Sequence, residues 1–551
     1  MASRAASWQD AAVFPKYGRC LGIPLVMEPR MRVILVHIRD PQFYAIQEGR
    51  RGKTGNPEVM GFPPIGIMCL SAVVKQAGHE CFMFDQANPD TPNEKILAEI
   101  KEKKPDLIGL SFLSTTSYPY AKMLARAIRS EMPNARIALG GVFATLNALQ
   151  VKEQCPYVDF VCRGDGEALI LDLLNNIENP TGVAGLTWAK DGKIVHNPDR
   201  KLERALDQWP FPDRDGVPVD YIESMPLDVP VVLSRSKFTT MQTSRGCPWP
   251  CIFCDIPIFN EGKWRYRSAE HVVAELKHLQ EKGYGAVAFV DDHFLLQPQR
   301  IEAICNGIIK EGIKIKWGVE GRVDSVVQKL FPLMAKANCR TIMFGIESGS
   351  QKILDRLKKG DTLEQVETAV KTAKKAGIEI VHGFFVVGNP DETEEDMQAT
   401  FDFAARLPLD TFGFNRLCVY RGTPLWHEYM QRGLVNDQED WYKYFKCSEI
   451  DPTCLKGERI NEIRAAGLRR LMLRKLFLHP WQTLRLLRRF MRYMPLKDIF
   501  TLLSKPFRGK KSGATRAEKL SRAVEHGDMK TQAADLTQLS DDKLEEALAK
   551  K

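Results

Sequence analysis

Three cysteines within eight residues form a dense group of potential metal ligands in this 551-residue sequence. Cys247, Cys251 and Cys254 lie in the segment Thr-Ser-Arg-Gly-Cys-Pro-Trp-Pro-Cys-Ile-Phe-Cys (243–254), on a loop stiffened by two prolines. Cysteine thiolates hold iron–sulfur clusters, usually four of them for a cubane. With three thiolates, one iron stays free to bind a small molecule. The spacing therefore predicts a [4Fe-4S] cluster with an open coordination site.

The pattern Cys-x3-Cys-x2-Cys, with Phe253 before the last cysteine, resembles the signature of the radical S-adenosylmethionine (SAM) superfamily. The resemblance implies that SAM chelates the free iron near Phe253. It also implies that an electron from the cluster cleaves a carbon–sulfur bond of SAM and yields a 5′-deoxyadenosyl radical. Zinc is the alternative, but structural zinc sites usually show four ligands. The nearest histidines, His271 and His278, lie well downstream in a helical pattern.

Polar residues and glycines follow the later predicted strands in the order seen in the superfamily. Any one of these motifs alone could be an ordinary turn, but the series argues against that explanation. The resemblance implies SAM contacts from Asp291, Asp292, Arg322, Glu347, Ser348 and Gly388.

Six strand-and-helix units must position these residues. The strand candidates begin near residues 238, 285, 315, 340, 378 and 411, and helical patterns separate them. Six units predict an incomplete (β/α)6 barrel of the TIM type. Its reactive groups are expected at the carboxyl ends of the strands.

A second alternating series precedes the barrel, with apolar runs at 31–38, 81–85, 106–112 and 135–141. Strands and helices in units of this length predict a doubly wound, Rossmann-like parallel sheet. The complete prediction is an α/β chain with the following segments: 1–30 extension, 31–180 Rossmann-like domain, 181–235 linker, 236–440 barrel, 441–507 helical basic region and 508–551 polar tail.

The motifs of residues 31–180 resemble the cobalamin (B12)-binding domain of a large radical SAM class. That class includes the anaerobic magnesium-protoporphyrin ester cyclase and several methyltransferases. The resemblance implies cobalamin contacts from Ser111, Gly140, Gly141 and Gly164. The DxHxxG motif of other B12 proteins is absent, and His37 with Asp40 does not recreate it, so the lower face of cobalt stays unassigned. A domain that keeps this shell without using cobalamin is the alternative.

Composition narrows the functional class. The chain is 44% hydrophobic and 27% charged, and residues 1–30 lack the apolar core of a secretory signal. We therefore expect a cytoplasmic protein with reduced thiols. Of the net charge of +9, residues 469–511 supply thirteen Lys or Arg against one acid, a local balance of +12. This uneven placement argues against a nucleic-acid-binding protein.

The basic segment also carries an amphipathic pattern. From Leu484 onward, arginines recur on one helical face and apolar residues on the other, while Pro480 and Pro495 limit the helix length. This pattern predicts a helix on the inner membrane surface that brings the barrel to a hydrophobic or lipid-like substrate. Packing of the same face on the barrel is the alternative.

Two outcomes of the radical step remain open at this point. The first is cobalamin-dependent methylation of an unactivated carbon, and the second is cyclisation, oxidation or carbon–carbon coupling in tetrapyrrole or lipid metabolism. Either outcome requires an external electron donor of flavodoxin or ferredoxin type. tRNA methylthiolation is disfavoured because the N-terminal cysteines are dispersed.

Overall fold

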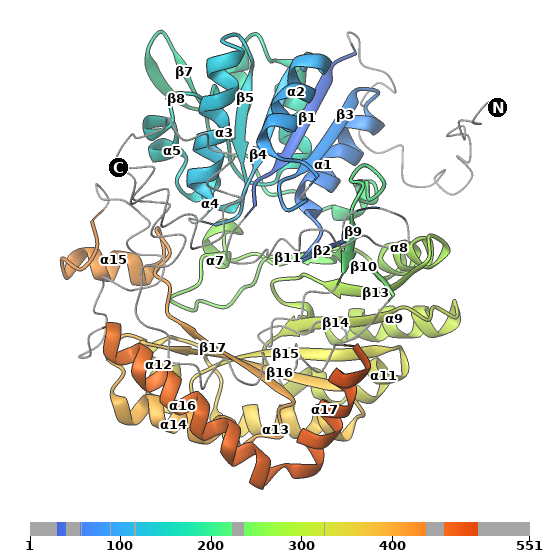
Figure 1. Ribbon diagram of the computed structural model, residues 1–551, viewed down its shortest axis with the longest axis vertical. Helices are drawn as coiled ribbons and strands as arrows, with labels where there is room; N and C mark the ends of the chain where they lie inside the picture. The colour runs from blue at the N-terminus through green and yellow to red at the C-terminus, as the bar shows by residue number, and fades with distance from the viewer. Residues whose placement is uncertain are drawn as a thin grey trace.

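A computed structural model gives the structure of the protein. It describes residues 30–39, 56, 58–88, 90–114, 117–222, 236–323, 325–436 and 457–493. In Figure 1 a sheet domain, coloured blue to green, lies above a barrel coloured green to orange. Residues 1–29 of the expected extension (1–30), residues 494–507 of the expected basic region and the whole expected tail (508–551) lie outside the described residues.

The first domain is built on a seven-stranded sheet with the order β3-β1-β4-β5-β6-β7-β8. The strands are β1 (Arg32–His37), β3 (Glu80–Asp85), β4 (Leu107–Ser111), β5 (Ile137–Gly140), β6 (Phe160–Cys162), β7 (Leu186–Lys190) and β8 (Lys193–His196). The first five in this order are parallel, whereas β7 and β8 are antiparallel. The segment expected as a linker thus contributes the last two strands at one side of this sheet, and β8 is the edge strand.

Helices cover both faces of that sheet, as the doubly wound prediction required. They are α1 (Ile65–Gln76), α2 (Asn93–Lys103), α3 (Tyr118–Glu131), α4 (Val142–Leu146), α5 (Ala148–Gln154) and α6 (Gly166–Asn175). Alternate side chains of a strand point to opposite faces. Ile34 and Val36 accordingly pack with α2 and α3, whereas Val33 and Leu35 pack with α1 and α6.

The second domain is the predicted partial barrel. Its six parallel strands follow chain order: β10 (Lys237–Met241), β13 (Tyr284–Phe289), β14 (Lys316–Gly321), β15 (Cys339–Glu347), β16 (Ile380–Val387) and β17 (Thr411–Arg416). The outer helices are α8 (Ala269–Glu281), α9 (Pro298–Lys310), α10 (Ser325–Gln328), α11 (Phe331–Lys336), α12 (Gln351–Arg356), α13 (Leu363–Lys375), α14 (Glu394–Arg406) and α15 (Pro424–Gln431).

Short elements fill the region between the two domains in Figure 1. They are β2 (Glu58–Met60), β9 (Asp220–Ile222), β11 (Ser244–Arg245), β12 (Arg265–Tyr266) and α7 (Ile256–Phe259). One apolar cluster is continuous across the boundary, because Phe238 of β10 and Met343 of β15 pack with residues of α1, α6 and β1.

Two helices after the barrel, α16 (Gly457–Leu478) and α17 (Pro480–Tyr493), end the described part of the chain. Pro480 begins α17, as expected, and α16 packs along α14. Close contact there requires Gly467, since a Cβ atom would lie 2.4 Å from the Phe401 ring. No described helix is long and apolar enough to cross a membrane.

Candidate active site

The cysteine loop that follows β10 is fixed at several points. Gly246 has φ +89°, and a Cβ atom there would lie 2.1 Å from the Lys263 carbonyl oxygen. Its N–H donates to Asp292 Oδ2 at 2.7 Å. Farther along, the Ile252 N–H donates to the Leu357 carbonyl at 3.1 Å, and the Ile252 side chain packs between α12 and α15. The backbone that carries the thiols is therefore held by the rest of the barrel.

The three thiols lie close enough for Cys254 to interact electrostatically with both Cys247 and Cys251. Burial raises the pKa of the Cys247 and Cys254 thiols, while Arg322 and Lys359 act in the opposite direction on Cys247. Within the described part of the chain, no group of acidic, histidine or cysteine side chains converges on a single metal ion. A cubane does not need such convergence, because each thiolate binds a different iron. The donor set therefore fits a [4Fe-4S] cluster.

Two cationic side chains accompany the thiols. Arg322, at the end of β14, lies with Nη1 3.5 Å from Cys251 Sγ and with its guanidinium over the Trp249 ring at 4.3 Å. Its Nη2 pairs with Asp361 Oδ1 at 2.8 Å. Lys359 is buried with its Nζ 3.1 Å from Glu347 Oε1. Arg322 therefore contacts the cluster loop, and Glu347 pairs with Lys359. The SAM contacts expected of Arg322 and Glu347 remain predictions.

Sequence reasoning did not identify Lys359, Asp361 or Trp249. Trp249 lies within the cysteine motif itself, whereas Lys359 and Asp361 lie in the turn between α12 and α13. The Lys-Gly-Asp-Thr run at 359–362, directly before a helix, was the available signal. The Glu347 backbone has φ +66°, an unusual value for a residue with a side chain and one found at functional sites.

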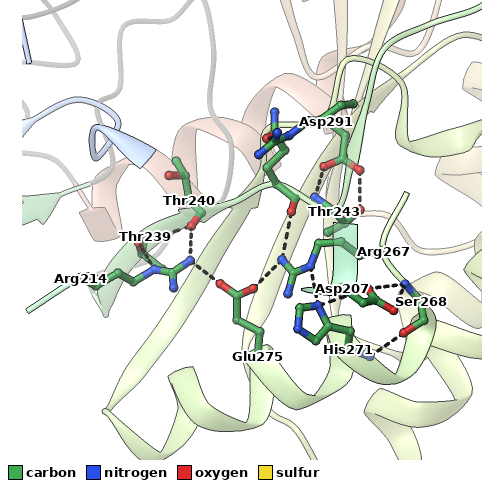
Figure 2. A network of polar contacts seen from close by, with 12 residues as sticks. Asp207, Arg214, Thr239, Thr240, Thr243, Arg267, Ser268, His271, Glu275 and Asp291 are labelled. Carbon is green, nitrogen blue, oxygen red and sulfur yellow. Dashed lines mark hydrogen bonds and ion pairs between the residues drawn. The ribbon is translucent and has the colours of Figure 1, made fainter. Parts of the chain in front are cut away.

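Asp291 and Asp292 face different partners. Both carboxylate oxygens of Asp291 accept hydrogen bonds from the loop, and Figure 2 shows Thr243, whose N–H donates at 2.6 Å. Ser244 Oγ also donates to Asp291, at 2.7 Å. Asp291 thus supports the first residues of the cysteine loop. Burial raises the pKa of Asp292 to about 6, and Asp291 adds to the effect. A SAM contact therefore remains a prediction for both residues.

Three other predicted SAM residues lie at strand or loop ends. The Ser348 side chain is fully buried and lies 3.1 Å from Thr400 Oγ1, so it faces α14. Phe253 packs against the apolar cluster between α12 and α15. Gly388 has φ +80°, and a Cβ atom there would lie 3.3 Å from Ile460 of α16. Their contact with SAM remains a prediction.

Glu320 on β14 is a further candidate that the sequence reasoning missed. Trp317 and Val319 of the same strand pack outward in the core, so Glu320 faces the barrel interior. Its side chain is accessible to solvent although protein surrounds it. This enclosure raises the pKa of Glu320 to about 7, and the charge of Asp292 contributes. Asp292 and Glu320 are therefore two carboxyl groups whose pKa values lie above their usual range.

The predicted cobalamin residues lie where the strands of the first sheet reach their carboxyl ends. Ser111 stands in register with His37 of β1 and with Gly140 of β5, at the carboxyl ends of these strands. The strand order reverses between β1 and β4, and ligands of doubly wound sheets bind at such a switch point. His37 Nδ1 lies 2.8 Å from Asp85 Oδ1.

Two loop glycines lie here, Gly141 and Gly164, and different structural constraints favour glycine at each position. At Gly141 a Cβ atom would lie 1.9 Å from the Phe112 carbonyl oxygen, so loop packing accounts for it. Gly164 has φ +82° and open space around its missing side chain. Its N–H donates to Thr145 Oγ1 at 3.1 Å. The open edge around Gly164 fits a bound cofactor, although the individual contacts remain predictions.

Two family models match the chain. The model of the radical SAM superfamily matches residues 241–404, and the model of the B12 binding domain matches residues 60–174. The matched segments contain the cysteine triad and the sheet edge described above. The cofactors of the chain are accordingly a [4Fe-4S] cluster, SAM and cobalamin.

Curated relatives agree with this pairing of domains. An uncharacterized methyltransferase of Pyrococcus horikoshii is 34% identical over 71% of this chain and 82% of its own length. The anaerobic magnesium-protoporphyrin IX monomethyl ester cyclase of Cereibacter sphaeroides is 27% identical over 84% of this chain and 74% of its own length.

Solved structures show the same fold. The radical SAM methyltransferase TsrM from Kitasatospora setae has a TM-score of 0.60 at 19% identity, covering 73% of this chain and 76% of its own. The cobalamin-dependent SAM radical enzyme OxsB has a TM-score of 0.55 at 20% identity, covering 80% and 62%. The chain belongs to the radical SAM superfamily, as an enzyme whose B12 binding domain precedes its radical SAM domain.

Proposed function

We propose that this enzyme transfers a methyl group from SAM to an unactivated carbon of a hydrophobic or lipid-like substrate. The observation that carries the proposal is the likeness, over 82% of its length, to a relative described as a methyltransferase. Other methyltransferases among the relatives support it, including the hopanoid C-3 methylase of Methylococcus capsulatus, at 24% identity. Ring closure, the reaction named for the cyclase relatives, is the second candidate, at 27% identity.

The chain's own residues have definable roles in this proposal. A [4Fe-4S] cluster supplies the electron for SAM cleavage, and cobalamin supplies methyl-transfer chemistry. Cys247, Cys251 and Cys254 would hold the cluster, with Arg322 Nη1 lying 3.5 Å from Cys251 Sγ and offsetting its negative charge. Glu320 faces the interior with a pKa of about 7, so it can hold or release a proton beside a bound polar group.

The decisive experiment follows the methyl group. Full-length enzyme, reconstituted anaerobically with iron, sulfide and hydroxocobalamin, is incubated with methyl-labelled SAM, a reductant and a bacterial lipid extract. Label in an extracted lipid supports methylation. A product without label that has lost two hydrogens supports ring closure or oxidation, and it would replace the methyltransferase proposal. Enzyme with Cys251→Ala is the matched control for chemistry that does not depend on the cluster.

We also propose an external electron donor of flavodoxin or ferredoxin type, because the other cysteines in the sequence show no ligand spacing. Purified flavodoxin with its reductase should replace dithionite in supporting 5′-deoxyadenosine release. Failure of both flavodoxin and ferredoxin, with dithionite active, would contradict this choice of donor.

Contact with an anionic membrane surface is proposed from an exposed apolar patch. Of fifteen large hydrophobic residues exposed in the described part of the chain, seven lie within 473–491: Leu473, Leu476, Phe477, Leu478, Trp481, Leu484 and Met491. Phe477 and Trp481 are 83% and 79% exposed. The buried face of α16, including Ile460, Ile463 and Leu471, already packs on the barrel. The seven exposed residues lie in the last turns of α16 and in α17, and Arg485 and Arg488 of α17 are also exposed.

Vesicle co-sedimentation tests the membrane proposal. A Phe477→Glu/Trp481→Glu double variant is compared with Ile309→Glu, which changes an exposed residue of α9. Each apolar side chain buried in lipid contributes about 1.5 to 3 kcal/mol, so the double variant should bind phosphatidylglycerol vesicles at least about tenfold less tightly. Equal binding by wild type and double variant would refute the proposal. A wild-type dimer that the double variant abolishes, without vesicle binding, would instead assign the patch to a second copy.

A further inference from the structure

Four charged residues connect the two domains between the predicted cofactor loops. Both Nη atoms of Arg245 pair with the Glu167 carboxylate, at 2.5 and 3.2 Å, and Nη1 also lies 3.2 Å from Asp165 Oδ1. Arg265 pairs with the other oxygen of Asp165. We refer to Asp165, Glu167, Arg245 and Arg265 as the interdomain ion network.

The network is enclosed and its charges balance. Side-chain exposures are 12% for Asp165, 5% for Glu167, 17% for Arg245 and 3% for Arg265. Although burial opposes ionisation, Arg245 and Arg265 hold the pKa of Asp165 below its usual value. Two anions thus face two cations away from bulk solvent. Buried ion pairs of this kind contribute little net stability, but they fix geometry and register.

On the first domain, the acidic pair lies beside the predicted cobalamin loop. Asp165 is the residue before α6, and Glu167 is in its first turn. Gly164, the open glycine of the sheet edge, is the immediate neighbour of Asp165. A shift of the acidic pair therefore moves the loop expected to hold the cobalamin tail.

On the barrel, the basic pair lies beside the cluster loop. Arg245 and Arg265 are cross-strand partners in the ribbon of β11 and β12. Arg245 is two residues before Cys247, and the N–H of the intervening Gly246 donates to Asp292 Oδ2 at 2.7 Å. Little freedom therefore remains between the Arg245 side chain and the first cluster ligand.

The need to hold the two domains together does not by itself explain why the ion network lies at this position. The continuous apolar cluster that contains Phe238 and Met343 already joins the domains, and the Phe62 and Phe238 rings lie 6.3 Å apart in it. An apolar contact of this kind is non-directional, whereas a bidentate arginine–carboxylate pair specifies orientation. The ion network supplies the orientation that the apolar contact lacks.

We propose that Arg245, paired with Glu167 and Asp165, is a positioning residue that sets the separation and orientation of cobalamin relative to the iron–sulfur cluster. The inference rests on the two-cofactor function proposed above, since a reaction that uses both cofactors on one substrate carbon requires them at a fixed distance. Misplacement by about 1 Å can reduce a rate about 100-fold.

The test measures the spacing of the cofactors directly. Full-length enzyme is loaded with cluster and cobalamin and reduced to the paramagnetic cobalt(II) and [4Fe-4S]+ states. The magnetic interaction between them is then recorded by electron paramagnetic resonance. This interaction depends on the inverse cube of the distance. Arg245→Lys and Glu167→Gln should alter it at unchanged iron and corrin content. Lys374→Met removes a 2.6 Å ion pair with Asp410 on the far side of the barrel and should leave the interaction unchanged.

The possible outcomes separate this inference from the proposed function. Wild-type enzyme that binds no corrin contradicts the cobalamin part of the proposed function. Variants that keep both cofactors and the wild-type magnetic interaction overturn the positioning role. Loss of corrin or iron from Glu167→Gln also overturns it, because the network would then be needed for loading. In the methyl-transfer assay of Glu167→Gln, labelled product should fall about 100-fold while 5′-deoxyadenosine release stays near the wild-type rate.

Discussion

Glu275 of α8 is a fully buried carboxylate that lies between two arginines, and its replacement by glutamine tests how the cysteine loop is supported. Its oxygens lie 2.6 Å from Arg214 Nη2 and 2.5 Å from Arg267 Nη1, as Figure 2 shows. Arg214 and Arg267 are also buried. Arg267 donates from its backbone to the Thr243 carbonyl at 2.9 Å and from Nη1 to the Gln242 carbonyl at 3.0 Å. Glu275 thus anchors the arginine that holds the start of the loop.

Glu275→Gln keeps the shape and removes the charge, leaving two guanidinium groups buried without a counter-ion. Breaking a buried pair in this way costs about 3 to 5 kcal/mol, a large part of a total stability of about 5 to 15 kcal/mol. If the free energy of unfolding falls by about 3 kcal/mol per molar urea, the urea concentration at the unfolding midpoint should fall by about 1 to 1.7 M. The measurement is urea unfolding of the full chain, followed by tryptophan fluorescence, with iron content measured in parallel.

The matched control is Lys277→Met on the same helix, whose ion pair with Glu311 is exposed and screened by solvent. The control should unfold at the wild-type midpoint. Burial alone would raise the pKa of Glu275, but Arg267 and Arg214 hold it below its usual value. A lowered carboxyl pKa stabilises the fold above the unfolded-state value of about 4.3. The stability that this lowered pKa contributes is lost as the pH falls below that value and through the pKa of Glu275 in the folded protein. Wild type and Glu275→Gln should therefore converge in acid. Equal midpoints at pH 7 would refute this account.

Three further predictions concern the cluster and the C-terminal helices. Cys251→Ala should lose the brown chromophore and SAM cleavage, and a variant that still binds four irons would contradict the cluster assignment. Arg322→Met removes a cation 3.5 Å from Cys251 Sγ, so the cluster reduction potential should become more negative in a potentiometric titration. Burial lowers the pKa of Lys475 to about 7. Since the unfolded value is about 10.4, stability should rise with pH between about 7 and 10 in wild type. Thermal unfolding of Lys475→Met should lack this rise.

Much of the fold could be predicted from the sequence because parallel strands buried on both faces are continuous apolar runs. Strand β1 of the first sheet and strands β13 and β16 of the barrel follow this rule. Strands β7 and β8 were less distinct, since Lys190, Asp191 and Lys193 interrupt the apolar pattern. The cysteine triad was identifiable because all three ligands lie on one short loop.

Other parts of the site depend on distant pairing, which periodicity does not encode. Asp291 and Asp292 are neighbours in sequence, but only the fold determines that Asp291 turns to Thr243 and Asp292 to Gly246. Glu167 and Arg245 are 78 positions apart. Glu320 could be placed in the barrel interior only once the inward face of β14 was known.

The apolar cluster that joins the domains has a consequence for protein engineering. Because Phe238 and Met343 of the barrel share a core with Val33 and Leu35 of the first sheet, neither domain has a closed core of its own at this boundary. Chimeras that exchange the B12 binding domain between relatives should fold only when these contact residues are transplanted together. The substrate range of such chimeras would then depend on which barrel they contain. The apolar residues at the domain boundary would have to come from the same parent protein.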